Sequence, residues 1–213
     1  MGILRQAKNP AQSRPLVIQY LHARRCISAC LQSPAAINHL VASAVVALEQ
    51  RRDDPSSSPL IRDDAIRSID VIQTFQRAVN SLDIGNAIYE PGPNPSTPLS
   101  ISGVDITVWP DAIAKVSPRS GERRVGEVFI RCTIGAAGDG AENRRSEANG
   151  HLATIAHMHA AANLTHLGTP HSPSSMVIDV SRRTVVRGPA NIARRVANIE
   201  AACAMIAAIW PTV

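Results

Sequence analysis

The chain has 213 residues, of which 45% are hydrophobic and 18% are charged, and its formal net charge is +5. This composition excludes a disordered chain, because it supplies enough apolar surface for a folded core. Aromatic residues make up only 3%, so the expected core is aliphatic. No apolar run approaches the roughly 20 residues that a membrane helix needs, and the first residues lack the pattern of a secretory signal. We therefore expect a cytoplasmic protein that does not enter a membrane.

Arginine carries almost all of the positive charge, since the chain contains twenty Arg and only two Lys, Lys8 and Lys115. A GC-rich genome that encodes cations as Arg explains this bias. Contact with phosphate groups explains it too, because the guanidinium fork binds phosphate in bidentate fashion. The four cysteines include no C-x-x-C pair. They are therefore expected to be small buried hydrophobic residues rather than metal ligands.

The first part of the chain, residues 15–90, is predicted to be helical and to follow a flexible lead at 1–14. A loose helical pattern covers residues 15–31. Ser33 followed by Pro34 is typical of a helix start, because Ser caps free N–H groups and Pro fits the first helical position. Apolar stripes at helical spacing then predict two further helices, over residues 33–54 and 63–82.

The segment EPGPNPSTP, residues 90–98, contains four prolines and is compatible with neither a helix nor a central strand. Beyond it the apolar pattern changes from helical to alternating, so the segment separates the helical part from a strand-and-helix part, residues 99–213. The elements expected there are a strand pair or one bent strand over 99–116, a strand over 125–134, a helix over 141–167, strands over 176–180 and 184–186, and a helix over 188–210.

Together these elements predict one α/β domain, α+β in the looser sense, over residues 15–213. Its small mixed β-sheet is expected to be flanked by helices, with a helical N-terminal extension. The order of a helix, three strands, a helix and a further strand over residues 33–188 resembles the core of the PD-(D/E)XK nuclease-like superfamily. Pro110 and Asp111 in GVDITVWPDAIAK, followed by the strand GEVFIRCTIG, add to this resemblance. The overall pattern is also similar to that of uncharacterised bacterial proteins.

The resemblance implies a divalent-metal site for cutting nucleic acid, because phosphodiester cleavage needs charge neutralised at the phosphate. It implies that Asp111 and Glu127 bind the metal ion, which would be Mg²⁺, and that Lys115 or Arg131 stabilises charge. The acid-x-Lys part of the signature is not intact, because Phe129 stands two residues before Arg131. The implied function is therefore that of a metal-dependent or a catalytically degenerate nuclease.

Five arginines and no acid lie within residues 181–195. Arg187 immediately precedes the expected start of the last helix, where free N–H groups favour anions. We therefore predict an anion or nucleic-acid backbone site at Arg182, Arg183, Arg187, Arg194 and Arg195. A solvated basic face, or pairing with Asp63, Asp64 and Asp70, is the alternative.

Five of the seven histidines lie between 151 and 171. Their helical spacing does not bring them around one ion, which favours positions on a helix surface or at the edge of the core. The leading functional hypothesis is thus a nucleic-acid-associated protein of nuclease-like fold. The alternative is a non-enzymatic interaction or regulatory module that forms homo-oligomers through its apolar helices, particularly residues 190–210.

Overall fold

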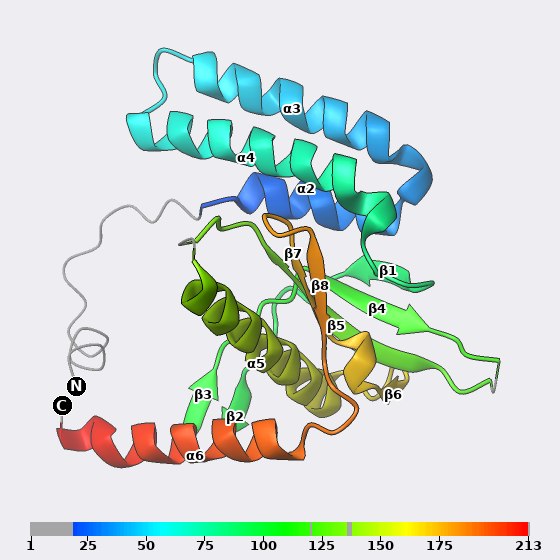
Figure 1. Cartoon of the computed structure of the whole chain (residues 1–213), viewed down its shortest axis with the longest axis vertical. Helices are drawn as coiled ribbons and strands as arrows, with labels where there is room; N and C mark the ends of the chain where they lie inside the picture. The colour runs from blue at the N-terminus through cyan, green and yellow to red at the C-terminus, as the bar shows by residue number, and fades with distance from the viewer. Residues whose placement is uncertain (1–18, 120, 136–137, 213) are drawn as a thin grey trace.

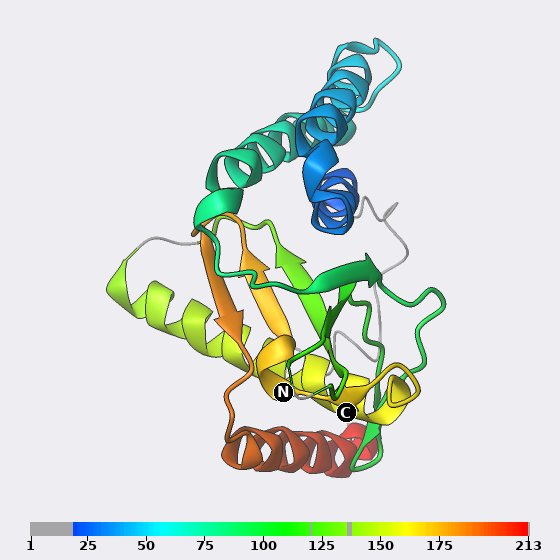
Figure 2. The ribbon, with the colours of Figure 1, turned by 90° about the vertical axis from the view of Figure 1, so that its right-hand side faces the viewer.

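The computed structural model describes residues 19–119, 121–135 and 138–212 (Figures 1 and 2). The predicted flexible lead at 1–14 lies outside these residues. Within them the chain forms five α-helices, a six-stranded mixed sheet and a separate two-stranded sheet, which confirms the α+β fold class. In this part of the chain, no helix combines the length and the hydropathy needed to cross a bilayer.

The N-terminal helices are α2 (Leu21–Gln32), α3 (Ile37–Asp53) and α4 (Pro59–Ala78). The helix α4 begins earlier than the apolar stripe predicts, because Ser58 caps it: the Ser58 hydroxyl accepts a hydrogen bond from the N–H of Ile61, and Pro occupies the first helical position. The helices α3 and α4 form an antiparallel pair, and α2 lies between this pair and the sheet (Figure 1).

The main sheet has the strand order β1-β4-β5-β7-β8, in which β5 and β7 are parallel and the other neighbours are antiparallel. Its strands are β1 (Ile88–Pro91), β4 (Ala112–Val116), β5 (Arg124–Arg131), β7 (Met176–Asp179) and β8 (Thr184–Arg187), with the short β6 (Thr169–Pro170) pairing with the start of β5. The edge strand β1 was not predicted, because it has only four residues and ends at a proline. The sheet therefore begins at Ile88, and β1 includes the first two residues of the Pro-rich segment.

A small hairpin of β2 (Leu99–Ile101) and β3 (Val104–Ile106) accounts for part of the strand pair expected over 99–116. Its two turn residues, Ser102 and Gly103, have φ values of 47° and 81°. Positive φ at both central positions is the geometry of a type I′ turn, which matches the twist of the flanking strands. The hairpin stands apart from the main sheet and packs against the C-terminal helix (Figure 1).

The helices cover both faces of the main sheet (Figure 2). The helices α2, α3 and α4 pack on one face and form the largest core with side chains such as Val128 and Ile178. The long helix α5 (Asp139–Asn163) covers the other face, and α6 (Ala193–Ile209) packs against α5 and the β2–β3 hairpin. All four cysteines are buried and free, as expected from their apolar surroundings.

Candidate functional site

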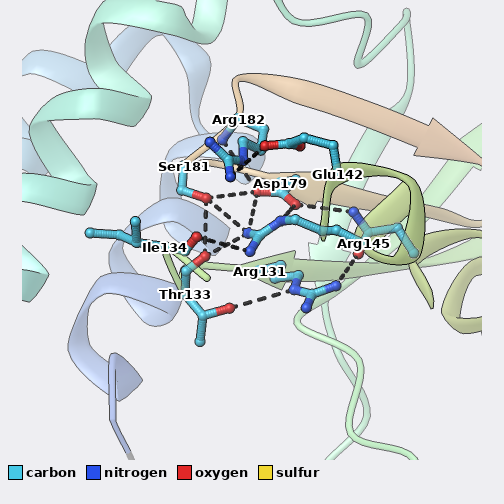
Figure 3. Close-up of polar contacts among 9 residues, drawn as sticks. Arg131, Thr133, Ile134, Glu142, Arg145, Asp179, Ser181 and Arg182 are labelled. Carbon is cyan, nitrogen blue, oxygen red and sulfur yellow. Dashed lines mark hydrogen bonds and ion pairs between the residues drawn. The ribbon is translucent and has the colours of Figure 1, made fainter. Parts of the chain in front are cut away.

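The carboxyl ends of β5 and β7 lie at one edge of the sheet, because the two strands are parallel neighbours connected through α5. Edges of this kind are where α/β folds commonly bind ligands. Here the edge carries a network of charged and polar side chains drawn from both strands and from α5 (Figure 3). The network contains one ion pair that is almost fully buried, and a groove opens beside it.

The buried pair is formed by Asp179, the last residue of β7, and Arg145 of α5. The Arg145 guanidinium binds both carboxylate oxygens, with Nε–Oδ2 at 2.5 Å and Nη2–Oδ1 at 2.7 Å, and Asn149 donates to Oδ2 over 3.0 Å. Burial raises the pKa of Asp179, but these hydrogen bonds and the charge of Arg145 outweigh it and lower the pKa overall. Arg145 also donates to the carbonyls of Thr133 and Ile134. The pair therefore holds α5 against the sheet edge and has little capacity left for a ligand.

The groove has a volume of about 340 Å³ and runs between α2 and the end of β5. Arg24 of α2 lines one side of it, and Arg131 and Thr133 line the other. Phe129 and Leu152 supply apolar walls. We call this feature the Arg24–Arg131 groove.

Arg131 is a half-buried cation whose nearest partner is neutral. Its Nη1 donates to Asn149 Oδ1 over 2.7 Å, and within the described part of the chain it forms no ion pair with a carboxylate. Burial lowers the pKa of Arg131, and the charge of Arg145 lowers it further, against the opposing effect of Asp179. Arg131 stays protonated all the same, because a free guanidinium has so high a pKa. An anion in the groove would therefore relieve an unfavourable local charge.

Asp111, one of the two predicted metal ligands, is turned toward α2. Arg24 Nε donates to its Oδ1 over 2.8 Å, and the backbone N–H of Ile130 donates to its Oδ2 over 2.7 Å. Burial raises the pKa of Asp111, and Arg24 and Ile130 offset this only in part. Both carboxylate oxygens already accept hydrogen bonds from the chain itself, which is not the open arrangement that a metal ion needs.

Glu127, the second predicted ligand, points the other way, toward α5. Its side chain is 0% exposed and its Oε1 lies 2.7 Å from Nδ1 of His159, which is 1% exposed. His159 Nε2 lies 2.8 Å from the carbonyl oxygen of Thr97, which can only accept a hydrogen bond, so Nε2 carries a proton and is the donor. The pKa of Glu127 is raised by burial despite His159. Burial alone lowers the pKa of His159, but its hydrogen bonds to Glu127 and Thr97 and the charge of Glu127 raise it overall.

This pair should make stability depend on pH. The raised pKa of His159 contributes to the free energy of unfolding. This contribution is complete below the ordinary His pKa of about 6.5 and is lost as pH rises through the folded-state value. The raised pKa of Glu127 likewise makes the folded state less stable as pH rises. We expect Glu127→Gln to remove this dependence, since Gln can donate to neutral His159. Urea unfolding should show the advantage of wild type over the variant shrinking as pH increases. An advantage independent of pH would contradict the assignment.

Ser96 Oγ lies 3.2 Å from His159 Nε2, so Ser96, His159 and Glu127 have distances similar to those of a Ser-His-acid triad. The position of the proton on His159 Nε2 is incompatible with the role of a catalytic base. The Nε2–H group donates a hydrogen bond to the carbonyl of Thr97, so Nε2 cannot also accept the hydroxyl proton of Ser96. The three residues instead fasten the Pro-rich segment to the sheet through α5.

The structure does not bring together the four residues of the implied catalytic site. Lys115 pairs with Glu90 of the neighbouring strand, with Nζ–Oε2 at 2.6 Å, while Arg131 binds α5. The expected metal pair, Asp111 and Glu127, contacts helices on opposite faces of the sheet. Among the described residues, no three or more His, Cys, Asp or Glu side chains are grouped so that they could bind a metal ion. The residues therefore do not fit the Mg²⁺ site that the sequence implied.

The pleating of the sheet accounts for this separation. Glu127 pairs in register with Ile113, and both side chains face α5, whereas Val128 faces α2 to α4. Asp111 precedes β4, where Pro110 interrupts the ladder, and there its side chain reaches Arg24. The chain bends at Asp111, immediately before β4, so the Asp111 carboxylate does not follow the alternation that puts Ile113 and Glu127 on the α5 face.

The five arginines between 182 and 195 do not form the single anion site that was predicted. Arg182 pairs with Glu142 of α5 at 2.5 Å, and Arg187 pairs with Asp83 at 3.1 Å. Both arginines are thus compensated by acids, as the alternative interpretation proposed, although the partners are not the acids it named.

The position of α6 removes the second argument for that site. The helix begins at Ala193, six residues after Arg187, so Arg187 does not lie at a helix N-terminus as expected. Arg194 is exposed, and Arg195 packs against α5 at Gly150. Arg182 and exposed Arg183 lie in the turn between β7 and β8, so the cluster is spread over that turn, β8 and α6 and gives no concentrated charge.

Sequence reasoning missed Arg24, Asn149 and Asp179. An acid ending an apolar strand is a signal that could have identified Asp179, since such residues lie at the carboxyl edge of a sheet. Nothing in the local sequence distinguishes Arg24, whose partner Asp111 is 87 residues away. Comparisons with protein-family models, with curated proteins and with solved structures find no match. The geometry of the Arg24–Arg131 groove is therefore the basis for a functional proposal.

Proposed function

We propose that this chain is a nucleic-acid-associated protein of PD-(D/E)XK-like fold that is catalytically degenerate. In it, the corner that holds a metal ion in such nucleases binds a phosphate group directly. The observation that carries this proposal is Arg131, a half-buried cation that faces a groove without a carboxylate partner among the described residues. The element order α4, β1, β4, β5, α5, β7 supports the fold, because it repeats the helix, three strands, helix and strand of that superfamily.

The charges of the groove suit a phosphate better than a metal ion. Arg24 neutralises Asp111, so Arg131 leaves the groove with a net positive charge. Guanidinium groups bind phosphate oxygens through paired N–H donors. Because Arg24 and Arg131 are both partly buried, their attraction for an anion is screened less than that of an exposed side chain.

The test is binding of labelled single- and double-stranded oligonucleotides by Arg131→Met, measured by fluorescence anisotropy across a range of salt concentrations. We expect affinity to fall for every sequence and the slope of log K against log salt to become shallower by about one. Arg119→Met is the matched control, because exposed Arg119 lies at the opposite end of β5 and its replacement changes the net charge equally. Equal losses in the two variants would contradict the proposal. Cleavage in Mg²⁺ that disappears in Asp111→Asn would also contradict it.

The second candidate is a module that forms homo-oligomers through α6. This helix exposes Met205, which is 60% accessible, beside a run of alanines that cover little of the core. Exposed apolar surface of this kind commonly marks a protein interface. Light scattering should then show a mass that increases with concentration, and a strict monomer at high concentration would rule this candidate out.

A further inference from the structure

A second and larger groove, of about 660 Å³, lies between α2 and α3. One side is a face of α2 that includes Cys26 and Ala29, and the other is a face of α3 that includes Leu40, Ala44 and Leu48. These positions recur at helical spacing, so the floor is a continuous apolar strip along both helices. We call this feature the α2–α3 groove, and it is separate from the Arg24–Arg131 groove.

Two cations stand on the rims of the α2–α3 groove. Arg25 is on the α2 side and Arg51 on the α3 side, both are exposed, and within the described residues neither forms an ion pair with a carboxylate. Arg51 Nη1 lies 3.2 Å from Nε2 of His22. Burial lowers the pKa of His22, and the charge of Arg51 lowers it further, so His22 accepts a hydrogen bond from Arg51 and supplies no negative charge to it. Asp54, at one end, already accepts hydrogen bonds from Ser56.

We propose that the α2–α3 groove binds an amphipathic helix of an acidic partner protein. The apolar stripe of that helix would lie on the floor, and its flanking Glu or Asp side chains would pair with Arg25 and Arg51. An apolar strip between two charged rims is the pattern by which helices bind in grooves. Ala29 and Ala44 line the groove with small side chains, which would let the backbone of the partner helix approach α2 and α3 closely.

Other possible occupants of the α2–α3 groove match its charge and its apolar floor less well. Residues 1–18 of this chain contain Arg5, Lys8 and Arg14 and no acid, so they would be repelled by the two rims. A second copy would bring another net charge of +5. A nucleic acid would match the arginines but not the apolar floor, because backbone contacts are polar and charged.

The test uses the full chain and two labelled helical peptides with the same Leu and Ala stripe, one flanked by Glu and the other by Lys. We expect the Glu peptide to bind at low salt and the Lys peptide not to bind. Arg25→Glu with Arg51→Glu should weaken the Glu peptide about tenfold, since each exposed ion pair contributes modestly. The control, Arg77→Glu with Arg119→Glu, makes the same charge change away from the groove and should leave most of the affinity.

A second variant tests the floor without altering charge. Ala47 lines the groove and is exposed, so Ala47→Trp should fill it and abolish binding while the unfolding midpoint in urea stays close to wild type. Three results would overturn the proposal: equal affinity for the Glu and Lys peptides, equal weakening by the control pair, or undiminished binding to Ala47→Trp. Binding of a synthetic peptide of residues 1–18 as tightly as the Glu peptide would also overturn it.

Discussion

Replacement of Arg145 by Met should lower the free energy of unfolding by about 3 to 5 kcal/mol, because it leaves a buried carboxylate without its counter-ion. The Asp179 side chain is only 1% exposed and would keep neutral donors alone: Asn149, Ser181 and the backbone N–H of Arg182. The carbonyls of Thr133 and Ile134 would lose their donor as well. Urea unfolding at neutral pH, monitored by circular dichroism, measures this loss.

Arg144→Met is the matched control, since Arg144 is the preceding residue of α5 and is exposed. Its effect should stay within about 0.5 kcal/mol. The loss in Arg145→Met should also diminish in acid. Arg145 helps to lower the pKa of Asp179 in the wild-type protein, so the stability that the pair contributes disappears as pH falls through that folded-state value and Asp179 becomes neutral in both proteins. Similar losses in the two variants would show that the pair does not stabilise the sheet edge.

Replacement of His159 by Leu should cost a comparable amount, about 3 to 5 kcal/mol, for the same physical reason. Glu127 is 0% exposed, and its second oxygen, Oε2, already has no hydrogen-bond partner among the described residues. Without His159 the carboxylate would be buried with no cation beside it, and the carbonyl of Thr97 would lose a donor. Urea unfolding measures the loss, and faster proteolysis within the Pro-rich segment should accompany it.

His157→Leu provides the control, because His157 is on the same helix, is half-buried and has no partner at Nδ1 in the described part of the chain. The double variant Glu127→Gln with His159→Leu should recover part of the stability, since it no longer buries a charge. No recovery in the double variant would mean that packing of the ring, and not charge pairing, explains the loss.

The sequence identified the fold class and most of the elements, because both depend on patterns within short windows. The spacing of Ile192, Val196, Ile199 and Cys203 predicted the last helix, and the structure has α6 from Ala193 to Ile209. The alternation around Val128 and Ile130 likewise predicted β5. Element boundaries were less exact: the stripe from Ile66 suggested a helix start near Asp63, while the Ser58 cap places it at Pro59.

The candidate site depended on contacts that no local pattern encodes. Asp111 and Glu127 were singled out together by the resemblance to the nuclease-like superfamily, but the strand register and the bend at Asp111 place their side chains against α2 and α5. Asp111 pairs there with Arg24, and Glu127 pairs with His159.

What the sequence by itself determined is thus the fold class, most of the helices and strands and the aliphatic core, because periodicity and capping are local. Only the tertiary structure decided which charges meet, since the partners are far apart along the chain: 87 residues for Arg24 and Asp111, and 34 for Arg145 and Asp179. Burial makes each of these pairings strong. Arg131, at the groove, has no carboxylate partner among residues 19–119, 121–135 and 138–212.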